Sequence, residues 1–151
     1  NYANANDGDI ENYSDDAATT LQSTITYTGL EPITSTVTAT NVTLNYSGAS
    51  ETITVTDAGS GQTNVDSTAG ETTTFNNPSG TLTINPGDGP GFLETVNVDS
   101  LAADYPANLT IDGQAGYDTV NFNGPISLAA DKSLTVQNAS VIDFPNTGSD
   151  V

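Results

Sequence analysis

The chain has 151 residues, a length that suits one domain with its own core. Nineteen acidic residues stand against one basic residue, Lys132, which gives a formal net charge of −18, and there is no His or Cys. Nucleic acids and anionic membrane surfaces are bound through Lys and Arg, so the composition excludes both as partners. It also excludes Cys or Ser–His catalysis and Cys-ligated zinc. No apolar run approaches the roughly 20 residues needed for membrane insertion.

The first twenty residues are polar and carry acidic side chains, among them Asp7, Asp9 and Glu11, without an apolar period. Such a segment is typical of a solvated chain without a core. We therefore predict an acidic extended tail or linker over residues 1 to 20, followed by a single β-solenoid domain over residues 21 to 151.

From residue 21 onward, Thr alternates with aliphatic residues in short stretches, for example at 24–28, 52–56 and 81–84. Alternation with a period of two is the pattern of half-buried strands, and clusters of Gly, Asn, Asp, Pro and Ser between them supply turns. Only residues 101–104 have the composition for one helical turn. The sequence predicts an all-β fold.

One segment repeats. Residues 80–98 return at 108–122 with the same order of strand, Gly-containing turn and strand, and residues 51–66 form an upstream relative. Leu109 follows Leu82 by 27 residues, Asp118 follows Glu94 by 24, and Leu134 follows Leu109 by 25. Periods of this size favour a right-handed parallel β-helix, or solenoid, over the alternative of an antiparallel β-sandwich. The residues expected to face inward are Ile53, Val55, Leu82, Ile84, Val96, Val98, Leu109, Ile111, Val120, Phe122, Leu134, Val136 and Ile142.

The chain is rich in Asp and Glu, whose carboxylate oxygens are the hard ligands that calcium prefers, so calcium is the candidate cofactor. Residues 113–121 fit the calcium-binding nonapeptide G-G-x-G-x-D-x-U-x except at Gln114, and residues 87–94 form a more degenerate copy. The competing interpretation is that both segments are solvated turns without metal. The candidate metal ligands are Asp88, Glu94, Asp112, Gly113, Gly116 and Asp118.

Catalysis is not expected. Paired carboxylates could cleave glycosides, but polysaccharide lyases built on β-helices use Arg or Lys, and the chain has only Lys132. Carbohydrate binding through exposed aromatic side chains stays open, with Tyr27, Tyr46, Tyr105 and Tyr117 as candidates.

The segment from Glu51 to Phe144 carries Gly80-Thr-Leu-Thr-Ile84, Glu94-Thr-Val-Asn-Val98 and Asp118-Thr-Val-Asn-Phe122. It resembles the repeat segments of very large bacterial extracellular and surface proteins, the filamentous-haemagglutinin-like and calcium-binding-repeat-like β-solenoid adhesins. The resemblance implies a parallel solenoid stalk outside the cell, in some cases with calcium in its turns.

We therefore expect a structural module of an extracellular or cell-surface protein, such as an adhesin stalk, surface layer or matrix component, stabilised by calcium. Its expected partners are neighbouring modules of the same protein, copies of itself and surface glycans. Two alternatives stay open: a self-assembling filament or sheath subunit that uses residues 18–28 for strand complementation, and a carbohydrate-binding module.

Overall fold

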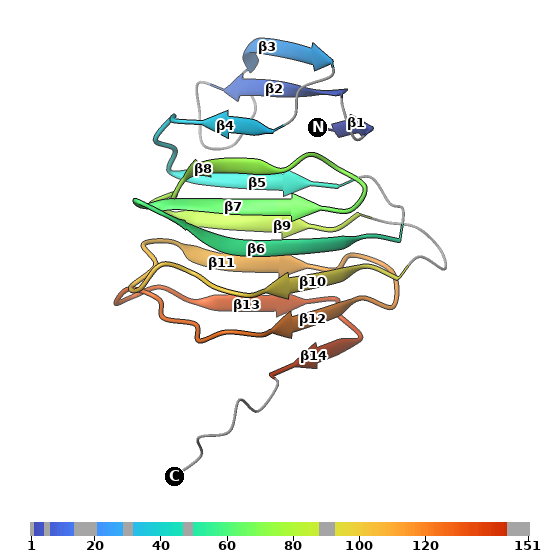
Figure 1. Cartoon of the computed structure of the whole chain (residues 1–151), viewed down its shortest axis with the longest axis vertical. Coiled ribbons are helices and arrows are strands. Elements are labelled where there is room, and N and C mark those ends of the chain that lie inside the picture. The colour runs from blue at the N-terminus through green and yellow to red at the C-terminus, as the bar shows by residue number, and fades with distance from the viewer. Residues whose placement is uncertain are drawn as a thin grey trace.

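The computed structural model describes residues 2–4, 7–13, 21–28, 32–46, 50–87 and 93–144, with side chains from residue 32 onward. The described residues form strands, turns and loops but no helix, which confirms the all-β prediction (Figure 1). Residues 101–104 form loop and turn only. Within the described part of the chain, no helix is long and apolar enough to cross a membrane.

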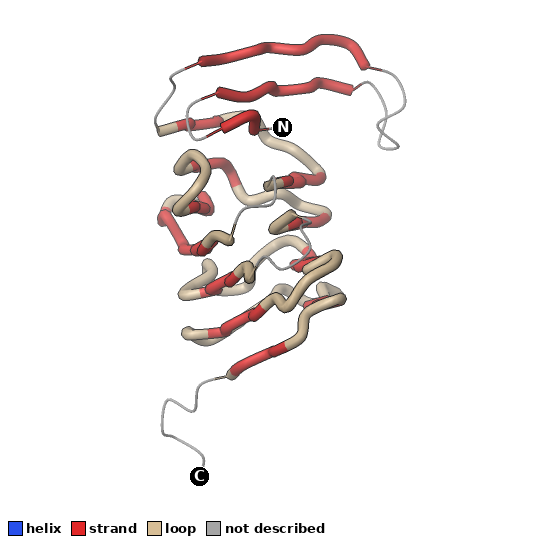
Figure 2. The backbone as a smooth tube through the Cα atoms, turned by 90° about the vertical axis from the view of Figure 1, so that its right-hand side faces the viewer, coloured by secondary structure: helices blue, strands red, loops and turns tan. Residues whose placement is uncertain are grey.

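Three antiparallel strands stand at the N-terminal end of the molecule (Figures 1 and 2). They are β1 (Tyr2–Asn4), β2 (Asp7–Tyr13) and β3 (Leu21–Thr28), in that order across the sheet. Both β1 and β2 fall in the segment expected to be a tail, and β2 pairs with β3 from residue 7 to residue 13. The segment expected as a tail (residues 1 to 20) and the start of the expected domain (residues 21 to 151) therefore contribute strands to the same sheet.

The rest of the chain alternates between two stacked sheets. One sheet contains β5 (Asn41–Asn45), β9 (Thr81–Asn85), β11 (Asn108–Asp112) and β13 (Leu134–Gln137), all paired in parallel. The other includes β6 (Thr52–Gly59), β10 (Thr95–Val98), β12 (Thr119–Phe122) and β14 (Val141–Asp143), also paired in parallel. We call these the β9 sheet and the β10 sheet. A strand of the β9 sheet with the next strand of the β10 sheet makes one rung of the stack.

The internal repeat sets the register between rungs. Leu109 lies beside both Leu82 and Leu134 on the adjacent strands of the β9 sheet. Val120 lies beside Val96 in the β10 sheet. The repeated sequence elements therefore stack directly on one another. The strands of neighbouring described rungs pair in parallel, whereas the strands of an antiparallel sandwich would pair antiparallel.

The β10 sheet is mixed because a hairpin is built into it. Strand β7 (Gln62–Ser67) runs antiparallel to β6 and to β8 (Thr73–Asn76), and β4 (Ile33–Ser35) pairs in parallel with β8. The reversal occurs at Gly59, Ser60 and Gly61, which all have positive φ. Glycine adopts this conformation without strain, so the turn sends the chain back along β6. The upstream relative of the repeat thus forms a hairpin in place of a plain rung.

The core lies between the two sheets and consists of the inward-facing aliphatic residues. Of the thirteen residues expected inside, ten are buried: Ile53, Val55, Leu82, Ile84, Val96, Val98, Leu109, Ile111, Val120 and Phe122. Leu134 and Val136 are partly buried, and Ile142 is exposed because β14 is the last described strand of the stack. Tyr105 and Ala107, from the segment between β10 and β11, also belong to the core, as do Leu44, Tyr46, Val65, Phe75 and Leu101.

Outward-facing side chains form hydrogen bonds between neighbouring rungs. The Asn121 amide donates to Asn97 Oδ1 at 2.8 Å, and the Asn85 amide donates to Asn45 Oδ1 at 2.6 Å. In each pair the two residues occupy the same register position on adjacent parallel strands. These ladders satisfy polar groups without charge, which suits a chain with only one basic residue.

Candidate functional site

Three acidic residues occupy equivalent positions at the start of three adjacent strands. Glu51, Glu94 and Asp118 immediately precede β6, β10 and β12. Their backbones continue the parallel pairing, because Thr95 N donates to Glu51 O at 2.9 Å and Thr119 N donates to Glu94 O at 3.0 Å. The three residues therefore form a column across the sheet, which we call the carboxyl column.

The carboxyl column faces the interior. In each strand the acidic residue continues the inward series: Glu94, for example, is followed by the buried Val96 and Val98. Glu51 is 5 % exposed, Glu94 is 1 % exposed and Asp118 is fully buried. Carboxyl groups almost never occupy such positions unless they are paired, because burial disfavours the charged form.

Glu51 has a hydrogen-bond donor inside the protein. The Ser67 hydroxyl donates to Glu51 Oε2 and accepts hydrogen bonds from Ala69 N at 3.1 Å and Gly70 N at 3.0 Å. Burial raises the pKa of Glu51, and the Ser67 hydrogen bond partly offsets this rise. The loop between β7 and β8 thus closes over this end of the column.

Glu94 and Asp118 have no such donor. None of their four carboxyl oxygens has a hydrogen-bond partner among the described residues. Adjacent strands lie about 4.8 Å apart, so two ionised carboxylates at this spacing would repel each other by roughly 3 kcal/mol at an effective dielectric constant near 20. Burial raises the pKa of Glu94 to about 7, and the neighbouring carboxyl groups of Asp118 and Glu51 add to this rise.

A glycine at the end of β11 makes room for Asp118. A Cβ atom on Gly113 would stand 2.6 Å from Asp118 Oδ2 and 2.8 Å from the backbone oxygen of Asn138. Both distances are far below van der Waals contact, so only glycine fits here. Two oxygens, one carboxylate and one backbone, therefore converge beside Gly113.

A fourth acidic side chain, that of Glu71, is also fully buried. It precedes β8 and continues the inward series of Thr73 and Phe75. Neither Glu71 nor Glu51 was expected as a site residue, although the period of two in Glu51-x-Ile53-x-Val55 places the acidic residue on the inner face.

The candidate calcium ligands are only partly brought together. Glu94, Gly113 and Asp118 meet at the carboxyl column, whereas Gly116 is exposed and its carbonyl accepts a hydrogen bond from the Ser140 hydroxyl at 3.4 Å. Asp88 lies outside the described residues. Within the described ranges, no group of three or more His, Cys, Asp or Glu residues is arranged to hold a metal ion.

Asp112 faces outward and already has donors. Its carboxylate accepts from Asn138 Nδ2 at 2.7 Å, Gln137 Nε2 at 2.6 Å and Gln114 N at 3.1 Å. Hydrogen bonds from the Asn138 and Gln137 side chains lower the pKa of Asp112. This residue caps the turn and links two rungs.

The tyrosines considered for glycan binding do not form a surface platform. Tyr46 and Tyr105 are buried, and the side chain of Tyr27 is outside the described set. Tyr117 is 69 % exposed. Tyr105 contributes to the core instead, with its hydroxyl 3.1 Å from Thr63 Oγ1.

Comparison of the chain with protein-family models, with curated proteins and with solved structures found no match.

Proposed function

We propose that the chain is a structural, non-enzymatic module of an extracellular or cell-surface protein, wound as a right-handed parallel β-solenoid. It would act as a segment of an adhesin stalk, a surface layer or a matrix. The observation that carries this proposal is the in-register stacking of rungs, with one continuous core inside and amide ladders outside. A stack of this kind transmits force and spaces other parts of a protein without needing an active centre.

The direction of winding is part of the proposal. In Figure 1 the chain descends from β9 to β14 while β10, β12 and β14 of the nearer β10 sheet run to the left and the strands of the β9 sheet run to the right. This course supports right-handed winding. Parallel strands joined by crossover connections are right-handed in nearly all proteins, which favours the same hand.

The charge also supports a surface role. Eighteen net negative charges on a chain of 151 residues keep copies apart and the surface hydrated, and they repel anionic polymers. The self-repulsion within the folded chain is relieved by salt, so a saline, cation-rich medium is the environment in which the module is most stable.

Two measurements test this function. Antibodies against the module should label intact cells of the source organism, and small-angle scattering of the purified chain should give an elongated monomer with the dimensions of the stack. Labelling only after the cells are broken open would contradict the extracellular role. Saturable binding of a glycan that Tyr117→Ala removes would favour the carbohydrate-binding alternative over a purely structural module.

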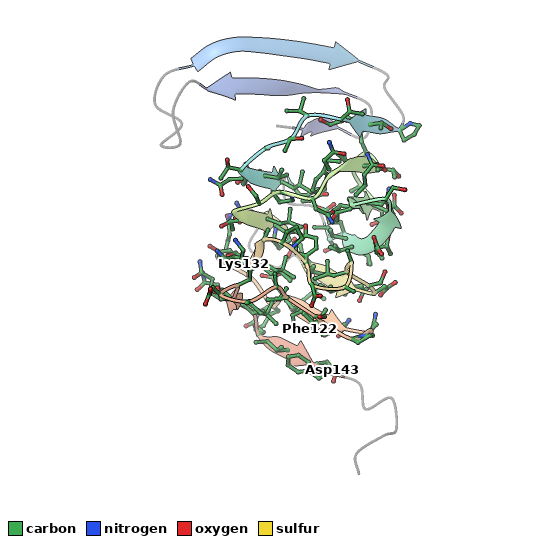
Figure 3. All side chains as sticks on the ribbon, turned by 90° about the vertical axis from the view of Figure 1, so that its left-hand side faces the viewer. Phe122, Lys132 and Asp143 are labelled. Atoms are coloured by element: carbon green, nitrogen blue, oxygen red, sulfur yellow. The ribbon has the colours of Figure 1, made fainter. Side chains whose placement is uncertain are left out.

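The filament alternative rests on the last strand. Val141, Ile142 and Phe144 are 50 %, 46 % and 62 % exposed, and the Phe144 ring stacks on that of Phe122. Phe122 lies toward the C-terminal end of the stack (Figure 3). Among the described strands, β14 pairs with β12 alone. An apolar strand edge of this kind can add a strand from a second copy.

Sedimentation velocity separates a filament from a single module. A filament subunit should form large species whose size falls in Ile142→Lys, because a charge on the edge strand opposes pairing. A single module should sediment as a monomer in both forms.

A further inference from the structure

Among the described residues, no positively charged group is a partner of the pair formed by Glu94 and Asp118. The whole chain has no His and a single basic residue, Lys132, whose ammonium group donates to the backbone oxygen of Ser79 at 2.7 Å. The four carboxyl oxygens of the pair are buried and have no donor among the described residues. When both groups are ionised, the positive charge that balances them therefore comes from solution, as a cation; otherwise one of them holds a proton.

The surroundings of the pair present oxygen atoms. Asp118 Oδ2 and the Asn138 backbone oxygen lie 2.6 Å and 2.8 Å from the position that a Cβ atom on Gly113 would occupy. Glu94 is on the next strand of the same sheet, at the equivalent register position. Carboxylate and backbone oxygens are the ligands of hard cations such as Ca²⁺ and Mg²⁺, and two carboxylates balance the charge of one divalent ion.

We propose that Glu94 and Asp118 bind one divalent cation, of which calcium is the best match, inside the core between two adjacent rungs. The site differs from the calcium turn expected from the nonapeptide, because Asp112 has other partners and Gly116 is on the surface. Calcium fits better than magnesium, because it accepts irregular oxygen cages and gives up its water more readily. The ion would join two rungs where their hydrogen-bond ladder begins. This inference stands independently of the proposed extracellular role.

The test measures calcium binding and thermal stability on the whole chain. The protein is first dialysed against a chelator, and its unfolding midpoint is then followed by circular dichroism during titration with CaCl₂, with MgCl₂ and NaCl as arms of matched ionic strength. Bound calcium is counted by atomic emission after gel filtration. We expect one calcium per chain and a rise in midpoint of about 5 to 10 °C at about 100-fold saturation, larger than the rise in the other two arms.

Two isosteric variants, Glu94→Gln and Asp118→Asn, each remove one charge from the pair. Both relieve repulsion in the cation-free protein, so both should fold, and a far-ultraviolet spectrum like that of the parent checks this. Each should lose the bound calcium and the calcium-specific rise. Asp131→Asn is the matched control, since Asp131 is exposed and its positive φ suits Asn. Asp131→Asn should keep both the bound calcium and the calcium-specific rise in midpoint.

Three results would overturn the proposal. The first is a calcium response of equal size in Glu94→Gln and in the parent. The second is an equal rise in midpoint with NaCl at matched ionic strength, which would mean that salt only screens the surface charge. The third is a parent protein that binds no calcium yet gains stability on acidification, which would mean that the pair holds a proton and no cation.

Discussion

Acidification should stabilise this protein when divalent cations are absent, whereas many proteins lose stability toward acid. The pKa of Glu94 is about 7 in the folded chain against 4.5 for an ordinary glutamate. The folded protein therefore holds this proton more tightly than the unfolded chain does. The stabilising contribution is complete below pH 4.5 and is lost as the pH rises through 7. Each pH unit is worth about 1.4 kcal/mol, so the loss is at most about 3 kcal/mol.

Urea unfolding at a series of pH values between about 5 and 8, in chelator and in about 0.2 M salt, measures this loss directly. Glu94→Gln has no titrating group at this position, so its free energy of unfolding should vary much less with pH. Glu51, whose pKa is also raised, leaves a smaller slope of the same sign. Asp112 has a lowered pKa and acts with the opposite sign only at more acidic pH, below this range.

The reasoning would be refuted by a free energy of unfolding that is constant or increases from pH 5 to pH 7 in the parent protein. It would also be refuted by the same slope in Glu94→Gln as in the parent. Asp131→Asn should reproduce the slope of the parent, because it removes an exposed charge that does not belong to the buried pair. A flattened slope in that control would mean that total charge controls the effect.

Three further substitutions test the packing. Gly124→Ala would place a Cβ atom 2.1 Å from the backbone oxygen of Asp99, so we expect a loss of about 1 to 3 kcal/mol, and an unchanged unfolding midpoint would contradict the close approach. Tyr105→Phe should cost about 1 kcal/mol in urea unfolding, because it removes the hydrogen bond to Thr63; a neutral effect would argue against that bond in solution. Leu109→Ala changes a fully buried position between two rungs and should cost about 2 to 5 kcal/mol of unfolding free energy. It should be more destabilising than Leu134→Ala, which changes the half-buried position beside it. The reverse order would contradict the placement of the core.

The register of the stack could be predicted from the sequence because each rung repeats the same inward positions. The offset of 27 residues between Leu82 and Leu109 and that of 25 between Leu109 and Leu134 are the pairings found in the β9 sheet. A side-chain period of two fixes which residues face inward, and a slip of one residue would expose them all. Ten of the thirteen inward residues were identified on this basis alone.

The hairpin could not be predicted from the same signal. Residues 51–55 alternate as the other rungs do, and the difference lies in the turn, where Gly59, Ser60 and Gly61 adopt positive φ and reverse the chain. Glycine is compatible with that conformation and with several others. The alternating pattern and the glycines of the turn therefore do not determine the antiparallel direction of β7, which depends on how the strand packs in the sheet.

The carboxyl column was predicted only in part. The two motif copies that resembled calcium turns singled out Glu94 and Asp118, in separate segments, as metal ligands or as residues of solvated turns. In the structure the period of two extends one residue beyond each strand, so Glu94 and Asp118 face the core while Asp112 faces outward. Local alternation was the better guide to the orientation of these side chains.

The strands lie across the long axis of the molecule, so the hydrogen bonds between rungs run along that axis (Figure 1). A force along the axis loads these bonds one rung at a time, so the rungs separate in sequence. A shear force would have to break all the hydrogen bonds of one ladder at once. Each rung that opens releases 24 to 27 residues, as the offsets Glu94 to Asp118 and Leu82 to Leu109 show, or about 80 to 95 Å of extended chain. Under tension the stack would lengthen in near-equal steps and would dissipate work with each step, behaving as an extensible shock absorber more than as a stiff strut.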